Sequence, residues 1–145
     1  MAVSSLSMEV SLMEGKMLSE HFSRGECACR DYCGFDTPDP RLLELAEKVR
    51  SILKEPMHVH SVCRCKARNA KQGGSPTSKH LKGQAMDFHC ERLSPLAVYN
   101  AIAKAWYDGR LPELGGVGLY DWGVHIDIAK APDGHLRTWD RRKAR

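Results

Sequence analysis

The sequence has no apolar run long enough to cross a membrane, and it begins without the basic and apolar regions of an ordinary signal peptide. It also has no internal repeats. We therefore expect a chain that does not span a membrane. We also expect it to be cytoplasmic as synthesised, unless it leaves the cell by another route such as lysis.

The length of 145 residues is that of one domain with its own hydrophobic core. We expect residues 1–17, which show no strong hydrophobic period, to form a poorly ordered arm or a short helix, and residues 18–145 to form the domain. The net charge of +4 lies largely in a basic C-terminal tail made of Arg137, Arg141, Arg142, Lys143 and Arg145. Such a tail is usually a solvated surface, and the alternative is a contact with an anionic polymer, either a cell wall or a nucleic acid.

The six cysteines lack the paired spacing of a zinc ribbon. They are Cys27, Cys29 and Cys33, then Cys63 and Cys65, then Cys90. Disulfide scaffolds belong mostly to shorter secreted chains, so free buried cysteines are the first interpretation. The alternative is a structural metal held by the first cluster together with Cys63 or Cys65.

Hydrophobic periodicity predicts two helices and several short strands. Each helix follows a capping residue and a proline, and the two helices cover about residues 40–54 and 96–107. The predicted strands are about Met57–Cys63, Gln84–Cys90 and Val124–Ile128, with Gly134–Trp139 as a candidate edge strand. This mixture predicts an α+β fold with a small, mainly antiparallel sheet and flanking helices.

Two segments between these elements are expected to be irregular. Arg64–Lys79 is a long polar loop, of a length that is usually functional or disordered. Gly115–Tyr120 is a glycine-rich lead into the next strand, and it lacks the order of glycines in a dinucleotide site.

The segment Ser75–Cys90 carries the residues best placed for chemistry. It begins as a loop and turns at Gly83 into an alternating strand, whose polar face includes Asp87. His80 lies just before the turn, so that it converges with Asp87, and His125 lies on the polar face of the later strand. If the two strands are neighbours, His80, Asp87 and His125 form a three-ligand zinc site with an open fourth position, which is the arrangement of catalytic zinc.

The order of these residues resembles the family of zinc D-Ala-D-Ala carboxypeptidases and murein endopeptidases, which shares its fold with the hedgehog signalling domain. The family pattern of Ser-x-His, six residues, Asp and a later His matches Ser78, His80, Asp87 and His125. An upstream Ser-x-x-Arg matches the run Ser61-Val62-Cys63-Arg64, and Gly116-Val117-Gly118-x-Tyr120 is typical of the murein peptidases. The match extends over about residues 18–139.

The resemblance implies a role for each matched residue. It implies zinc on His80, Asp87 and His125, and it implies that Arg64 holds the substrate, whose carboxylate suits a guanidinium fork. Many members have a general-base Glu three residues before the last zinc His, and this position is Trp122 here. Asp127 shares a strand face with His125 and is the predicted base, with Asp121 as the alternative. His58, His60 and His89 are expected to have structural or surface roles.

The implied function is zinc-dependent hydrolysis of peptide bonds in peptidoglycan stem peptides, by a carboxypeptidase or an endopeptidase of the endolysin type. The expected partner is the peptide substrate rather than a nucleic acid, and the chain is expected to be a monomer that acts on the cell wall after export or lysis. The alternative is a zinc-containing module that binds the cell wall or serves a structural role without cleaving anything, as in hedgehog domains.

Overall fold

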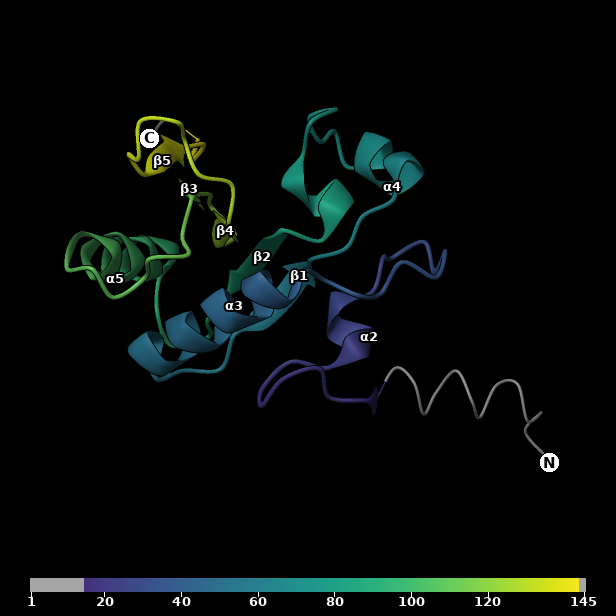
Figure 1. Cartoon of the computed structure of the whole chain (residues 1–145), viewed down its shortest axis with the longest axis horizontal. Helices are drawn as coiled ribbons and strands as arrows, with labels where there is room; N and C mark the ends of the chain where they lie inside the picture. The colour runs from purple at the N-terminus through teal and green to yellow at the C-terminus, as the bar shows by residue number, and fades with distance from the viewer. Residues whose placement is uncertain (1–14, 144–145) are drawn as a thin grey trace.

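The computed structural model describes residues 15–143, whose helices and strands are mixed along the chain as an α+β fold requires (Figure 1). In chain order they are α2 (Arg24–Cys27), α3 (Pro40–Leu53), β1 (His58–Ser61), α4 (Lys66–Lys71), the 3-10 helix η1 (Lys79–Lys82), β2 (Ala85–His89), α5 (Pro95–Tyr107), β3 (Gly116–Leu119), β4 (Val124–Asp127) and β5 (Arg137–Asp140). The two long helices and strands β1, β2 and β4 therefore form close to where periodicity predicts them, and β5 overlaps the candidate edge strand at 134–139.

The described strands form one five-stranded sheet in the order β1-β2-β4-β3-β5. The pairs β1–β2, β2–β4 and β3–β4 are antiparallel, whereas β5 is parallel to β3. The sheet is therefore mainly antiparallel, as predicted, but it is mixed because of the parallel pair at its last edge. The reason is the connection after β4, which passes β3 and returns to the outer edge of β3 instead of closing a hairpin with β4.

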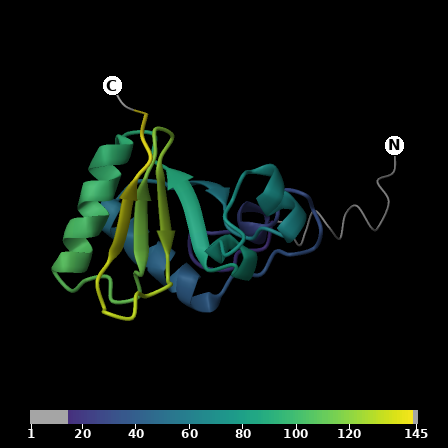
Figure 2. The same cartoon turned by 90° about the horizontal axis from the view of Figure 1, so that it is seen from above.

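Helices α3 and α5 cover one face of the sheet (Figures 1 and 2). In α3 the Asp39 side chain accepts the N–H of Arg41 as the N-cap, Pro40 takes the first turn, and the buried stripe includes Leu42, Leu45 and Val49. Apolar side chains of the strands meet this stripe and that of α5 in one core. Those side chains are Met86, Phe88, Val117, Leu119, Val124 and Ile126. Because strand side chains alternate, the intervening residues face away from the helices, and that face carries the candidate site.

Two segments that were expected to be irregular contain regular structure. The predicted loop at 64–79 includes helix α4 and the first residue of η1, and the glycine-rich segment at 115–120 contains strand β3 itself. Glycine is required within β3, because a Cβ on Gly118 would lie 2.2 Å from Nε1 of Trp139 on the neighbouring strand β5. Weak strand propensity in sequence is thus overridden by a close approach between strands.

Most of the arm predicted at 1–17 lies outside the described residues, and within them Met17 pairs with Ser23 in an isolated bridge. Arg137, which was counted in the basic tail, begins β5 and so belongs to the sheet, and this strand overlaps the candidate edge strand at 134–139. Among the described residues, no helix has the length and apolar character of a membrane span.

Candidate metal centre

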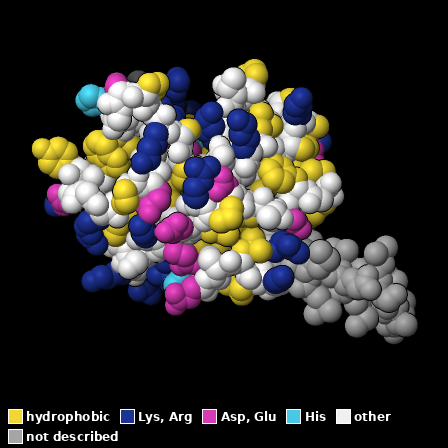
Figure 3. All heavy atoms as spheres, viewed as in Figure 1, with side chains coloured by type: hydrophobic (Ala, Val, Ile, Leu, Met, Phe, Trp, Pro, Cys, Tyr) yellow, Lys and Arg dark blue, Asp and Glu magenta, His cyan; other side chains and the backbone are white. Residues whose placement is uncertain are grey.

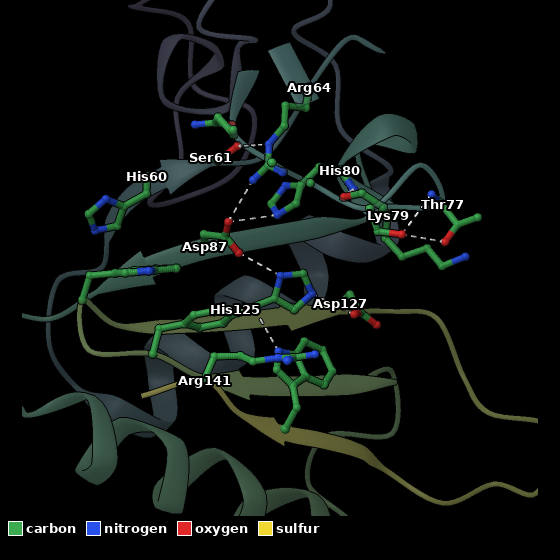
Figure 4. A pocket seen from close by; sticks show the side chains of 18 of the residues that line it. His60, Ser61, Arg64, Thr77, Lys79, His80, Asp87, His125, Asp127 and Arg141 are labelled. Atoms are coloured by element: carbon green, nitrogen blue, oxygen red, sulfur yellow. Dashed lines mark hydrogen bonds and ion pairs between the residues drawn. The ribbon is translucent and has the colours of Figure 1, made fainter. Parts of the chain in front are cut away.

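Three neighbouring elements bring together the residues predicted as metal ligands. His80 lies in η1, Asp87 in β2 and His125 in β4, and Asp87 is paired directly with His125 in the sheet register. Gly83 ends η1 in the left-handed conformation, at φ +64°, and so turns the chain into β2. One ligand atom from each of His80, Asp87 and His125 lies within 4.8 Å of the other two. Figure 4 shows Asp87 between His80 and His125 on the pocket wall.

The hydrogen bonding of His80 leaves one ring nitrogen for a cation. Nδ1 lies 2.8 Å from the carbonyl oxygen of Val62, which only accepts, so Nδ1 carries the proton. Nε2 then presents its lone pair at 3.1 Å from Oδ2 of Asp87. Nε2 is buried and has no hydrogen-bond partner among the described residues. Two electron-pair donors that face each other in this way fit a metal ion between them, because a metal satisfies both.

His125 lies between two carboxylates. Its Nδ1 is 2.8 Å from Oδ1 of Asp87, and its Nε2 is 2.8 Å from Oδ2 of Asp127. Burial works to lower the pKa of His125, but the bonds to Asp127 and Asp87 outweigh burial and raise this pKa to about 9. With its pKa raised, His125 carries a proton on each ring nitrogen. A metal ion at Nδ1 would displace the proton of that nitrogen, while the Nε2–H bond to Asp127 would fix the tautomer.

Asp87 is the buried carboxylate that the other groups surround. Burial alone would raise its pKa, but the hydrogen bond from His125, together with the neighbouring imidazole of His80, holds the pKa well below its usual range. The ionised carboxylate and the two imidazole nitrogens form a donor set of one oxygen and two nitrogens. This set suits zinc, and three protein ligands leave a fourth position for water or substrate.

Arg64 lies beside the centre and is held by three partners. Its Nε donates to Ser61 Oγ, its Nη1 to Asn69 Oδ1 and its Nη2 to Asp87 Oδ2, each at 3.1 Å. A guanidinium has five N–H groups, so two of them stay available toward the pocket that Arg64 lines. Arg64 can therefore contact the predicted metal ligand Asp87 and hold a substrate group at the same time.

Asp127 lines the pocket but is only 1% exposed. Its Oδ2 contacts His125, and its Oδ1 accepts hydrogen bonds from the N–H of Ala129 at 3.0 Å and from Arg137 Nη2. Burial raises its pKa, but His125 and Arg137 outweigh burial and lower it. The carboxylate is thus ionised, and both of its oxygens have partners. Asp121, the other predicted base, is exposed and accepts the N–H of Lys143 at 3.1 Å.

The three candidate ligands line a pocket of about 800 Å³, and several cationic side chains also line it. They are Arg64, Lys79, Arg137 and Arg141. Figure 3 shows Lys and Arg side chains in the region between β5 and α4, where this pocket lies. The cations favour a substrate that carries negative charge.

The pocket wall also contains residues that sequence reasoning did not assign to the site. Arg137, Trp139 and Arg141 occupy alternate positions in and just after β5, and all three line the pocket. This alternation is the signal in the sequence, and the basic composition of the segment obscured it. His60 also lines the pocket, and its Nε2 contacts Nδ1 of His89 at 2.6 Å.

Comparison with known protein families identifies a match. A protein-family model described as Peptidase M15 matches residues 20–127. No curated protein matches the chain. The matched segment includes Arg64, Asp127 and all three candidate ligands, whereas β5 lies beyond it.

Replacement of one candidate ligand should remove one metal ion. We expect His125→Ala to lower the zinc content by one ion per chain, since the substitution removes a donor that no neighbouring group replaces. Metal analysis after gel filtration measures this. His135→Ala is the matched control, because His135 is exposed and belongs to none of the groups of described residues that could hold a metal. An unchanged zinc content in His125→Ala would show that His125 is not a ligand.

Proposed function

The chain belongs to the Peptidase M15 family, and we propose that it is a zinc-dependent peptidase that hydrolyses peptide bonds in peptidoglycan stem peptides, as a carboxypeptidase or an endopeptidase. The family supports peptidase activity and zinc dependence. The single observation that carries the proposal is the buried Nε2 of His80, whose lone pair faces the Asp87 carboxylate at 3.1 Å. This pair of acceptors calls for a cation at the base of the pocket.

The residues around the centre hold its donors in place. Val62 orients His80 through its carbonyl, Arg64 holds one oxygen of Asp87, and Asp127 orients His125. When bound, zinc supplies Lewis-acid chemistry: it activates water as a nucleophile near neutral pH and polarises the scissile carbonyl. Strands β2 and β4 hold Asp87 and His125 in place and η1 holds His80, and catalysis by positioning requires such fixed donors.

The charge of the pocket lining favours a peptide substrate that has a free carboxylate. The two unused N–H groups of Arg64 suit a carboxylate, and Lys79, Arg137 and Arg141 add positive charge around it. Trp122 is 42% exposed and stacks on Tyr120, with ring centroids 4.9 Å apart. These aromatic rings offer an apolar wall for the side chains of a stem peptide.

One observation favours the alternative, a zinc-containing module that binds without cleaving. Trp122 stands three residues before His125, where many relatives carry the general base, and its indole cannot accept a proton. Asp127 has partners on both oxygens. A cleavage assay separates the two functions, since both require zinc but only the peptidase releases products.

The proposed activity predicts metal-dependent release of peptides from purified peptidoglycan. Mass spectrometry of soluble products should show cleaved stem peptides with the zinc-loaded protein, none after chelation, and recovery when zinc is returned. His125→Ala is the inactive control. Binding to peptidoglycan without any product, at full zinc occupancy, would support the non-catalytic module and contradict the peptidase.

Arg64→Ala should raise the KM for peptides with a free C-terminal carboxylate. Loss of a charge-assisted hydrogen bond corresponds to roughly a 10- to 100-fold change in kcat/KM. Zinc should stay bound, because Asp87 keeps its contacts with both imidazoles. Arg64→Lys keeps the charge without the fork and should recover only part of the loss. Arg110→Ala, on the exposed surface, is the control. Metal loss together with misfolding in Arg64→Ala would mean that Arg64 is structural.

Asp127→Asn separates two roles for this carboxylate. A general base should lose about two to four orders of magnitude in rate while zinc stays bound. A residue that orients His125 should instead lose roughly 10- to 100-fold in zinc affinity, and its contacts with His125 and Arg137 favour this outcome. Rate and zinc affinity are measured on the same protein.

Asp121→Asn gives the parallel test of the other predicted base, and Asp133→Asn is the exposed control. A rate unchanged in Asp127→Asn at full zinc occupancy would rule out the base role of Asp127.

A further inference from the structure

The six cysteines fall into two spatial groups. All lie within the described residues, and none forms a disulfide. Cys27, Cys63 and Cys90 are buried in the hydrophobic core, and burial raises the pKa of Cys27 and of Cys63 to about 12. These core thiols are inert. The second group is Cys29, Cys33 and Cys65, whose sulfur atoms all lie within 4.8 Å of one another.

Three backbone features bring this second group together. The N–H of Cys29 donates to Phe35 O at 2.8 Å and the N–H of Tyr32 donates to Cys29 O at 2.9 Å, so the chain folds back between Cys29 and Cys33. Tyr32 and Gly34 adopt positive φ values of 53° and 97° in this turn. Cys65 comes from the start of α4, and its own N–H donates to Cys29 Sγ at 3.5 Å.

Two of the three sulfurs accept backbone hydrogen bonds. Cys29 Sγ accepts the N–H of Cys65, and Cys65 Sγ accepts the N–H of Arg68, each at 3.5 Å. Such hydrogen bonds stabilise a thiolate more than a thiol. Arg68 and Lys71 also place their cationic groups 3.4 Å from the carboxylate of Asp31, which is 4.0 Å from Cys65 Sγ. These two cations offset the negative charge of the carboxylate beside Cys65.

We propose that Cys29, Cys33 and Cys65 bind a second zinc ion as three thiolates, beside the Asp31 carboxylate, which lies 4.0 Å from Cys65 Sγ. Three sulfur donors suit zinc, and each thiol gives up its proton to solvent when the metal binds. Neither the zinc centre at His80 nor the peptidase activity is needed for this site, because it shares no residue with them. Sequence spacing alone left Cys63 and Cys65 as alternative partners of the first cluster, and the structure places Cys65 there.

The proposed ion has a structural consequence for the pocket. It joins the turn at 29–33 to the start of α4, two segments that are more than 30 residues apart in sequence. Helix α4 carries Asn69, which accepts a hydrogen bond from Arg64 and donates one to Ser75 O at 2.9 Å. The thiolate site therefore anchors the segment that forms one rim of the pocket.

Cobalt substitution tests the proposal, because thiolate-to-cobalt charge transfer gives near-ultraviolet absorption that His and Asp ligands do not. The background is His125→Ala, which removes the other centre. Loaded with Co²⁺ under reducing conditions, it should bind one cobalt per chain and show this absorption. Addition of Cys33→Ser should abolish both, and since Cys33 is exposed this change should leave the fold intact. Addition of Cys90→Ala, a buried cysteine outside the group, should leave both unchanged.

A second measurement uses the unmodified sequence and needs no variant to fold. Bound Zn²⁺ should protect Cys33 from iodoacetamide, and chelation should restore its alkylation, as located by mass spectrometry. Absence of thiolate absorption in the His125→Ala protein would overturn the proposal. Equal alkylation of Cys33 with and without zinc would also overturn it, as would a disulfide among the three cysteines in protein prepared under reducing conditions.

Discussion

A buried carboxylate, that of Asp87, sets the arrangement of the rest of the site. Ionised carboxylates are costly to bury unless they are paired and hydrogen-bonded. Asp87 meets this requirement with Arg64 on one oxygen and His125 on the other, and His80 faces it from η1. The three partners come from different segments, so the pairing of β2 with β4 and the turn at Gly83 must both be correct for the carboxylate to be tolerated. The same contacts that allow Asp87 to be buried in the fold therefore also bring the candidate metal ligands together.

The charges continue beyond Asp87 in an alternating chain across the sheet. Arg64 contacts Asp87, Asp87 contacts His125, His125 contacts Asp127 and Asp127 contacts Arg137. Two guanidinium groups therefore match two carboxylates, and the proposed divalent ion would add net positive charge at the base of the pocket. That charge, together with Lys79 and Arg141 on the wall, would direct anionic groups of the proposed substrate toward the centre.

Local patterns in the sequence predicted the parts of the fold that depend on local physics. Capping residues and prolines located α3 and α5, and the alternation around Asp87 and His125 located the two strands that carry the site. Strand β3 was missed because its glycines lack the usual strand signature, and their role appears only when Trp139 packs against Gly118. Arg137 was assigned to the tail because its partner, Asp127, is brought near only by the parallel pairing of β5 with β3. Non-local pairings of this kind leave no periodic trace in one sequence.

The segment between β1 and η1 shows why a long polar stretch need not be a free loop. Arg64 ties its start to Asp87, and Asn69 ties its middle to Ser75. Gly74 packs so closely on Asn69 that a Cβ would lie 2.1 Å from the amide oxygen, which leaves room only for glycine. Cys65 adds a further connection, to Cys29 in the turn before α3. Each tether removes conformational freedom from the rim of the pocket, and the polar composition that suggested a loop supplies the hydrogen-bonding groups for these tethers. The rim is therefore positioned by side chains, and its order depends on the same Arg64–Asp87 contact that organises the metal centre.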